Sequence, residues 1–186
     1  PFYFMGQVME VNFEYEAPAT LAALGGANGY QHLYLEGRGK PASENSTLSW
    51  MNEGRYYTLT SATAESDELL FSRIGANDPA FNLRRDAALM IRRDNAASTV
   101  FATAIETHGS YSPVTELSVN SRSSISKLKI AYDDERYTAV SVTDVGGGTS
   151  FLVLANTDAD MSARHKLTVD GKTYRWAGPW YWIAVE

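Results

Sequence analysis

The chain has 186 residues, of which 44% are hydrophobic and 20% are charged, as in an ordinary globular domain. Sixteen basic against 22 acidic residues give a net charge of −6, which argues against nucleic acid as the main partner. The absence of cysteine excludes disulfides, thiolate metal sites and cysteine nucleophiles. No apolar run is long enough for a membrane span, and an acidic polysaccharide stays open as a partner where basic residues gather locally.

Hydrophobic and polar residues alternate with a period of two through much of the chain, which is typical of strands with one buried face. The alternation is clear at residues 9–15, and a long connection follows in which we expect one short helical turn near Leu21. Two hairpins are expected, one closed by the three-residue loop Asn52-Glu53-Gly54 and one by the two-residue turn Asp170-Gly171. Further strands are expected at residues 68–74, 88–92, 98–105, 125–132, 137–142, 150–155 and 180–185.

These patterns predict an all-β fold, an antiparallel β-sandwich of about a dozen strands with negligible helix. No repeat or linker divides residues 1–186, so we expect a single β-sandwich domain. The apolar start, Pro1-Phe2-Tyr3-Phe4, leads directly into a strand pattern, and we interpret the chain as the C-terminal fragment of a larger protein.

Residues 73–85 form the first of two polar segments with candidate functional residues. Turn formers interrupt a strand pattern there, and the segment ends in Arg84 and Arg85, whose guanidinium groups suit the carboxylates of an acidic ligand. Arg92 and Arg93 could act in the same way. All four could instead pair with neighbouring acidic residues, namely Asp78, Asp86 and Asp94, and both interpretations stay open.

Residues 106–111 are predicted to form a second polar loop, in which His108 lies close to Tyr111. In β-elimination from a uronate, a base removes the C5 proton, a neutralising group stabilises the developing charge, and an acid protonates the departing oxygen. His108 and Tyr111 are weak candidates for the base and the acid, and His108 is also a candidate substrate-binding residue. Alternatively, His108 caps a turn and the Tyr111 hydroxyl bonds to nearby backbone.

Two further groups have a functional and a structural interpretation each. His32, Tyr34 and Glu36 share one face of an expected strand and could line a groove, although a solvent-facing or domain-facing surface is favoured. The aromatic C-terminus could stack on sugar rings, or it could serve core packing and an interdomain contact. Its members are Tyr174, Trp176, Trp180, Tyr181 and Trp182.

Metal binding has little support in the spacing of possible ligands. The three histidines are widely separated. Asp158 and Asp160 alternate as in a calcium loop, but Met161 and Leu167 stand where that loop needs Gly and Glu. We therefore expect no metal and no cofactor in this chain.

Three stretches resemble the C-terminal β-sheet domain of alginate and oligoalginate lyases of polysaccharide lyase family 17, in the heparinase II/III-like superfamily. The resemblance spans residues 5–113 and weakens toward the C-terminus. The middle stretch is fairly specific and the other two are supportive. The stretches are Gly29-Tyr30-Gln31-His32-Leu33-Tyr34, Arg73-Ile74-Gly75-Ala76-Asn77-Asp78-Pro79-Ala80-Phe81-Asn82-Leu83-Arg84 and Glu106-Thr107-His108-Gly109-Ser110-Tyr111.

The resemblance implies a parent enzyme with an N-terminal α/α toroid, absent here, that cleaves alginate oligosaccharides by β-elimination outside the cytoplasm, as a secreted or periplasmic bacterial protein. It places the catalytic Asn, His and Tyr mostly in the toroid and makes zinc an expectation for the parent only. The expected partners are the protein's own toroid, alginate oligosaccharides and a second copy of the protein. We expect the chain to support the toroid and line its cleft, with the two polar loops facing it, and to be inactive alone. The alternatives are a non-catalytic acidic-glycan binding module and an interdomain or dimerisation domain.

Overall fold

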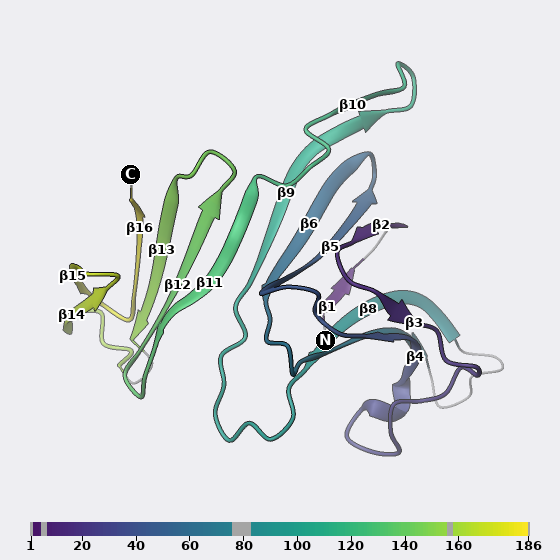
Figure 1. Cartoon of the computed structure of the whole chain (residues 1–186), viewed down its shortest axis with the longest axis horizontal. Coiled ribbons are helices and arrows are strands. Elements are labelled where there is room, and N and C mark those ends of the chain that lie inside the picture. The colour runs from purple at the N-terminus through teal and green to yellow at the C-terminus, as the bar shows by residue number, and fades with distance from the viewer. Residues whose placement is uncertain (1, 5–6, 76–82, 156–157, 186) are drawn as a thin grey trace.

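The computed structural model describes residues 2–4, 7–75, 83–155 and 158–185, and their regular secondary structure is almost entirely β-strand (Figure 1). The predicted all-β class is confirmed, and every strand pair in the described ranges is antiparallel. No helix in these ranges is long and apolar enough to cross a membrane. The elements are β1 (Phe2–Phe4), β2 (Gln7–Val11), β3 (Tyr15–Glu16), the 3-10 helix η1 (Tyr30–His32), β4 (Leu33–Gly39), β5 (Asn45–Asn52), β6 (Arg55–Ala62), β7 (Glu68–Gly75), β8 (Leu83–Arg92), β9 (Thr103–Ser112), β10 (Leu117–Val119), β11 (Ile125–Asp133), β12 (Tyr137–Asp144), β13 (Thr149–Ala155), β14 (Arg164–Val169), β15 (Lys172–Ala177) and β16 (Trp180–Val185).

Strands β1 to β10 form two five-stranded sheets that face each other. Sheet A has the order β1-β8-β7-β4-β3 and sheet B the order β10-β9-β6-β5-β2. Alternate residues of both sheets point into a shared apolar core, as the period-two pattern predicts. The buried members of this core are Phe13, Leu48, Trp50, Leu59, Leu69, Phe71 and Leu89.

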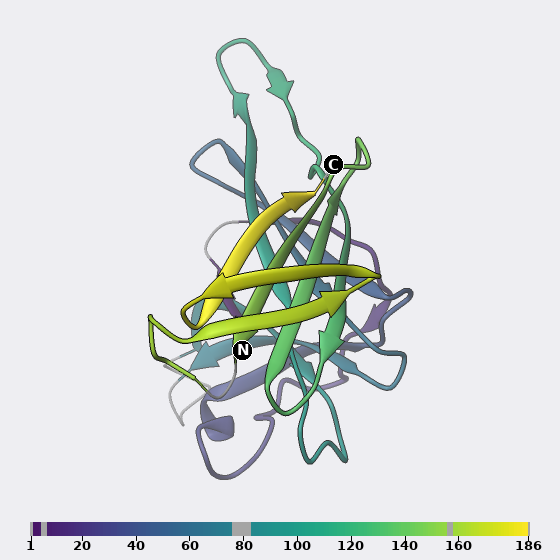
Figure 2. The same cartoon turned by 90° about the vertical axis from the view of Figure 1, so that its left-hand side faces the viewer.

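The C-terminal part adds sheet C, with the order β11-β12-β13-β16, and the hairpin of β14 and β15. Figure 2 shows the hairpin crossing over the strands of sheet C, so that it covers one face of that sheet. Hairpin and sheet enclose a second core rich in aromatic residues. Its buried members are Ala139, Phe151, Val153, Leu167, Val169, Tyr174 and Trp176.

Sheet C meets sheet B along β11, and several of the contacts between the two sheets are polar. The side-chain amide of Asn45 donates from Nδ2 to the Leu128 carbonyl (2.6 Å) and accepts from the Leu128 N–H at Oδ1 (3.0 Å). Asn45 thus pairs with β11 as a peptide group of a neighbouring strand would. Lys127 and Glu44 form an ion pair beside it at 3.0 Å.

The two predicted hairpin turns are present, and one of them is shorter than expected. Asn52 pairs with Arg55, so the β5–β6 turn has two residues, Glu53 and Gly54, and the predicted three-residue loop is wrong. Both turn residues have positive φ (49° and 73°), as a type I′ turn requires. The Asp170-Gly171 turn is confirmed, with φ values of 47° and 80°.

Three local predictions need correction. The helical turn lies at Tyr30–His32 and not near Leu21. The strand expected at residues 98–105 begins only at Thr103, and residues 106–111 belong to that strand, β9, and not to a loop. In the first polar segment, Arg84 and Arg85 lie within β8, and residues 76–82 lie outside the described ranges.

Candidate functional site

A polar cleft of about 380 Å³ lies on the face of sheet B that points away from sheet A. The strand register explains its composition. Because Leu59 points into the shared core, its neighbour Thr58 points to the opposite, outward face of sheet B. Glu106 is the cross-strand partner of Thr58 and therefore lies on the same outward face, in β9. The cleft is lined by Met9, Glu10, Thr47, Ser49, Tyr56, Tyr57, Thr58, His108, Ser121, Arg122 and Ser123.

His108 is the buried histidine of this cleft, with 9% of its surface exposed. Its Nδ1 lies 2.8 Å from the Asn120 carbonyl, and its Nε2 lies 2.9 Å from Thr58 Oγ1. A carbonyl can only accept, so Nδ1 carries the proton, and Nε2 of the neutral ring accepts from the Thr58 hydroxyl. Thr58 Oγ1 is in turn 2.8 Å from Ser49 Oγ, which completes a relay of hydroxyl groups that ends at the imidazole.

This bonding determines what His108 can do in the cleft. Both ring nitrogens are engaged by protein groups, and the ring stacks on Tyr56 with centroids 6.1 Å apart and planes 13° apart. The Tyr56 hydroxyl is held by Ser118 Oγ at 2.7 Å. His108 could take a proton from a ligand only if Thr58 turned away, so the arrangement suits a fixed structural imidazole better than a free base.

Gly109 allows β9 to lie close to the returning chain at this point. Its φ is +56°, and a Cβ atom there would come within 1.9 Å of the Val119 carbonyl oxygen. No other residue type fits without displacing the backbone. The close approach brings the Asn120 carbonyl to His108.

Glu106 anchors the segment that leads from β10 to β11. Its carboxylate accepts hydrogen bonds from the Ser123 hydroxyl, the Ser124 hydroxyl and the Ser124 backbone N–H. Burial alone would raise the pKa of Glu106, but the hydrogen bonds from Ser123 and Ser124 outweigh this effect and lower the pKa. The Glu106 carboxylate is therefore a fixed anion that holds Ser123, a residue of the cleft lining, in place.

The other predicted site residues are not brought together with His108. Tyr111 lies on β9 opposite Ser118 and is not among the described residues that line the cleft. Arg84 and Arg85 are in β8, a strand of sheet A, whereas His108 is in sheet B. Only their backbone is described, so their proposed contact with substrate stays a prediction.

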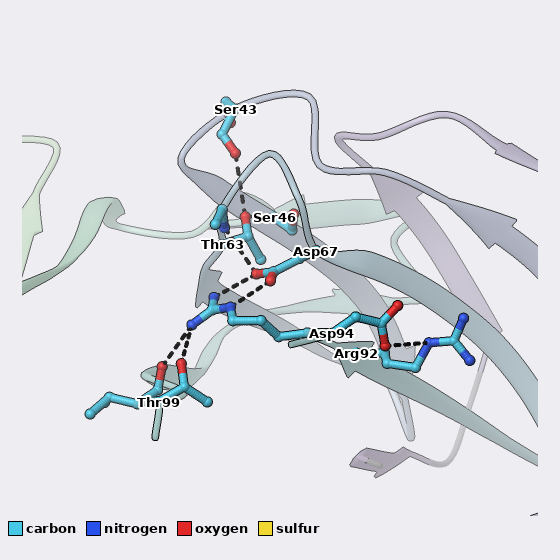
Figure 3. Close-up of polar contacts among 10 residues, drawn as sticks. Ser43, Ser46, Thr63, Asp67, Arg92, Asp94 and Thr99 are labelled. Carbon is cyan, nitrogen blue, oxygen red and sulfur yellow. Dashed lines mark hydrogen bonds and ion pairs between the residues drawn. The ribbon is translucent and has the colours of Figure 1, made fainter. Parts of the chain in front are cut away.

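Arg92 and Arg93 are engaged in ion pairs, but their main partners are Glu68 and Asp67 and not the acidic residues expected from the sequence. Arg92 pairs with Glu68 and lies 3.8 Å from Asp94, while the Arg93 guanidinium forms two 2.6 Å hydrogen bonds to Asp67 (Figure 3). Asp67 is fully buried. Burial raises the pKa of Asp67, but hydrogen bonds from Arg93 and the Ala64 N–H outweigh this and lower the pKa.

The structure separates the aromatic C-terminus into two groups. Tyr174 and Trp176 are buried in the second core and Tyr181 packs against it, whereas Trp180 and Trp182 are exposed. The His32, Tyr34 and Glu36 triplet is also divided. His32 lies in η1 outside the strand, Tyr34 is buried, and Glu36 pairs with Arg73.

Metal ligands do not converge in the part of the chain that the structure describes. No group of three His, Asp or Glu side chains in these ranges could hold a metal ion. Asp158 and Asp160 cap backbone N–H groups in their own turn.

The sequence analysis missed the Ser49–Thr58–His108 relay. The only signal of this relay in the sequence is that Ser49 and Thr58 share the outward face of the β5–β6 hairpin.

The fold and cleft together define the chain as a β-sandwich with a second, hairpin-covered sheet. Residues 146–181 match the family model described as the C-terminal domain of exo-oligoalginate lyase-like proteins. The chain is 36% identical over 179 residues to an alginate lyase of Stenotrophomonas maltophilia, covering 96% of this chain and 24% of that protein. It is 28% identical over 182 residues to an exo-oligoalginate lyase of Saccharophagus degradans, with the same two shares.

These matches confirm the resemblance to the C-terminal domain of alginate and oligoalginate lyases. The similarity to the two lyases runs through nearly the whole chain, including both β cores. The chain spans about a quarter of the length of these relatives.

Proposed function

We propose that this chain is the C-terminal β domain of a polysaccharide lyase that degrades alginate oligosaccharides by β-elimination. In that enzyme it supports a toroidal catalytic domain and lines one side of the substrate cleft. The observation that carries the proposal is the similarity of 96% of this chain to one quarter of two alginate-degrading lyases. An enzyme that acts on an extracellular polymer belongs in the periplasm or outside the cell, and zinc is proposed only for the longer enzyme.

The chemistry itself is assigned to the part of the enzyme outside this chain. Both ring nitrogens of His108 are engaged, and His165 is buried against Trp176 in the second core. Each is therefore poorly placed to remove a proton from a uronate. His32, in η1, belongs to no cleft described above.

A second function, acidic-glycan binding without catalysis, is favoured by the composition of the cleft on sheet B. Arg122 is an exposed cation on its rim, and Thr47 and Ser121 add hydroxyl groups to its lining. Arginine is suited to the carboxylates of uronates. In the longer enzyme this cleft would hold part of the substrate chain.

The test compares the isolated chain with the longest polypeptide in which it occurs. Each is incubated with alginate oligosaccharides, and the absorbance of the unsaturated uronate product is followed. We expect product only with the longer polypeptide; steady product from the clean 186-residue chain, or none from either, would contradict the proposal.

The role of the cleft is tested by Arg122→Ala in the longer polypeptide, with Arg164→Ala on the exposed side of β14 as the matched control. We expect KM to rise roughly tenfold for Arg122→Ala only, since a charged hydrogen bond contributes about 1.5–3 kcal/mol. Equal KM values in the two variants would show that the substrate does not bind in this cleft.

A further inference from the structure

The hydroxyl relay in the cleft on sheet B has a direction that depends on the charge of His108. In the neutral ring, Nδ1 donates to the Asn120 carbonyl, so Nε2 accepts from the Thr58 hydroxyl at 2.9 Å. A hydroxyl group has one hydrogen to donate, so Thr58 Oγ1 must accept from Ser49 Oγ, 2.8 Å away. The Ser49 hydrogen therefore points to Thr58, and Ser49 offers only its lone pairs to the cleft.

Protonation of His108 reverses each bond of this relay without moving a heavy atom. Nε2 then donates to Thr58 Oγ1, the Thr58 hydrogen turns to Ser49 Oγ, and the Ser49 hydrogen is free to point into the cleft. The one covalent change is the new N–H bond at Nε2, formed with a proton from solvent. Nδ1 donates to the Asn120 carbonyl in both charge states. Both states are thus fully hydrogen-bonded, as a buried imidazole requires.

The other buried histidine, His165, lacks this property. It is 7% exposed and His108 is 9% exposed, so the two rings are buried to nearly the same extent. Nε2 of His165 has no hydrogen-bond partner among the described residues, and its Nδ1 is 3.4 Å from the Tyr137 hydroxyl. A proton added at Nε2 of His165 would lack an acceptor, whereas Thr58 provides one for His108. Burial alone therefore does not account for the bonding of His108.

The charged and titratable groups around His108 come from four elements. Glu106, two residues earlier on the same face of β9, is an anion that offsets part of the charge of a protonated imidazole. Tyr56 of β6 stacks on the ring. Glu10 of β2 and Arg122 of the segment before β11 line the same cleft and have opposite charges. The charge of His108 therefore decides whether the lining of the cleft is neutral or positive.

We propose that Ser49 binds the ligand of this cleft and that His108 sets the polarity of its hydroxyl group. When His108 is protonated, Ser49 donates a hydrogen bond to a carboxylate oxygen of a bound uronate; when His108 is neutral, Ser49 can only accept. The inference rests on the proposed binding of an acidic glycan in the cleft. His108 is a positioning residue in it, because it acts through Thr58.

The direction of the pH dependence follows from the chemistry of the carboxylate. An ionised carboxylate has acceptors only, so it is matched by Ser49 as a donor and opposed by the lone pairs of Ser49 as an acceptor. Ser49 is half-buried, which shields this contact from water. Histidine side chains change charge between about pH 5 and pH 8. Binding therefore strengthens as the pH falls through this range.

Calorimetric titration of the chain with alginate oligosaccharides at about pH 5.5 and about pH 8 tests the proposal, since carboxylates stay ionised at both values. We expect binding to be at least roughly fivefold tighter at the lower pH, and Ser49→Ala to reduce this ratio to about twofold or less. Thr168→Val is the matched control. Thr168 and Thr173 form a cross-strand hydroxyl pair at 2.8 Å, as Ser49 and Thr58 do, but on the exposed face of the β14–β15 hairpin. This variant should keep the full ratio.

The nitrogen-15 resonances of the imidazole test the relay without any ligand. At about pH 8, His108 should carry its proton on Nδ1 and none on Nε2, and at about pH 5.5 both nitrogens should be protonated in the folded chain. Ser49→Ala should leave these protonation states unchanged, because the Thr58 hydroxyl stays in place. The spectra thus separate an altered ligand contact from an altered imidazole.

Each other outcome overturns the proposal in a distinct way. Absence of binding at both pH values would refute glycan binding in the cleft and this inference with it, whereas equal binding at the two pH values would refute this inference alone. A ratio that survives Ser49→Ala would show that the charge of His108 acts on the ligand directly. A His108 ring that stays neutral at about pH 5.5, or carries its proton on Nε2 at about pH 8, would show that the relay does not reverse.

Discussion

The buried ion pair of Asp67 and Arg93 offers the sharpest test of what stabilises this fold (Figure 3). Both carboxylate oxygens of Asp67 accept from the Arg93 guanidinium, and Oδ2 also accepts from the Ala64 N–H at 2.9 Å. Arg93 donates further to Thr99 Oγ1 at 2.6 Å. The pair therefore ties the β6–β7 connection to the segment that follows β8.

Asp67→Ala should destabilise the chain because it leaves a buried guanidinium without its anion. Removing one partner of a buried pair typically costs about 3–5 kcal/mol. The Arg93 side chain is 18% exposed and keeps its bond to Thr99, so the lower end applies. A loss of about 3 kcal/mol corresponds to a fall in Tm of roughly 6–12 °C for a chain of this length.

Urea denaturation followed by circular dichroism measures this loss in a double-mutant cycle. The double variant Asp67→Ala/Arg93→Met should cost about 2 kcal/mol less than the sum of the two single changes. Asp94→Ala is the matched control, because Asp94 is 74% exposed and lies 3.8 Å from Arg92, and we expect a change below about 0.5 kcal/mol. An Asp67→Ala variant as stable as Asp94→Ala, or strictly additive losses, would refute the reasoning.

Three further predictions concern sheet B. His108→Ala should lower the unfolding free energy by about 2 kcal/mol by urea denaturation, because the Thr58 hydroxyl loses its acceptor; normal stability with reduced turnover in the longer enzyme would instead indicate contact with substrate. Asn45→Ala should speed amide hydrogen exchange at Leu128, and unchanged exchange would mean that the joint holds without Asn45. The pKa of Glu106 is lower in the folded chain than in the unfolded chain, so its carboxylate stabilises the fold above the unfolded pKa of about 4.3. This stabilisation is lost as the pH falls through the folded pKa. Glu106→Gln should therefore lose less stability between pH 7 and pH 3 than the natural chain, and equal losses in the two proteins would contradict this.

Period-two alternation was enough to predict most strands, because each strand buries one apolar face. It failed at β9, where the polar residues Glu106 and His108 lie on the face of the strand that points away from the shared core. His108 is buried and Glu106 is half-buried, through contacts with Thr58 and with residues 120–124, which are distant in sequence. Local pattern cannot distinguish a solvated polar loop from a strand whose polar face has partners elsewhere in the chain.

The same limit applies to the candidate site. Alternation in β16 separates Trp180 and Trp182 from Tyr181, so the sequence could predict two groups of aromatic residues. It could not predict which group would be buried, because that depends on the hairpin of β14 and β15 crossing one face of sheet C. The Asp67–Arg93 pair joins residues 26 positions apart and has no local signature either.

The polar contacts of β9 and β11 bear directly on how the chain could serve a larger enzyme. Apolar packing tolerates small shifts, whereas a buried carboxylate or amide loses most of its stabilisation once its partners move. Glu106 holds the segment before β11, and Asn45 pairs with β11 itself, so the orientation of sheet C on sheet B is set by directional bonds. His108 fixes the neighbouring segment in the same way, through the Asn120 carbonyl. The histidine that local sequence marks as a catalytic candidate thus has a structural task that explains its burial and both of its hydrogen bonds. A domain fixed by such contacts can position a cleft wall or a neighbouring domain without supplying a reacting group.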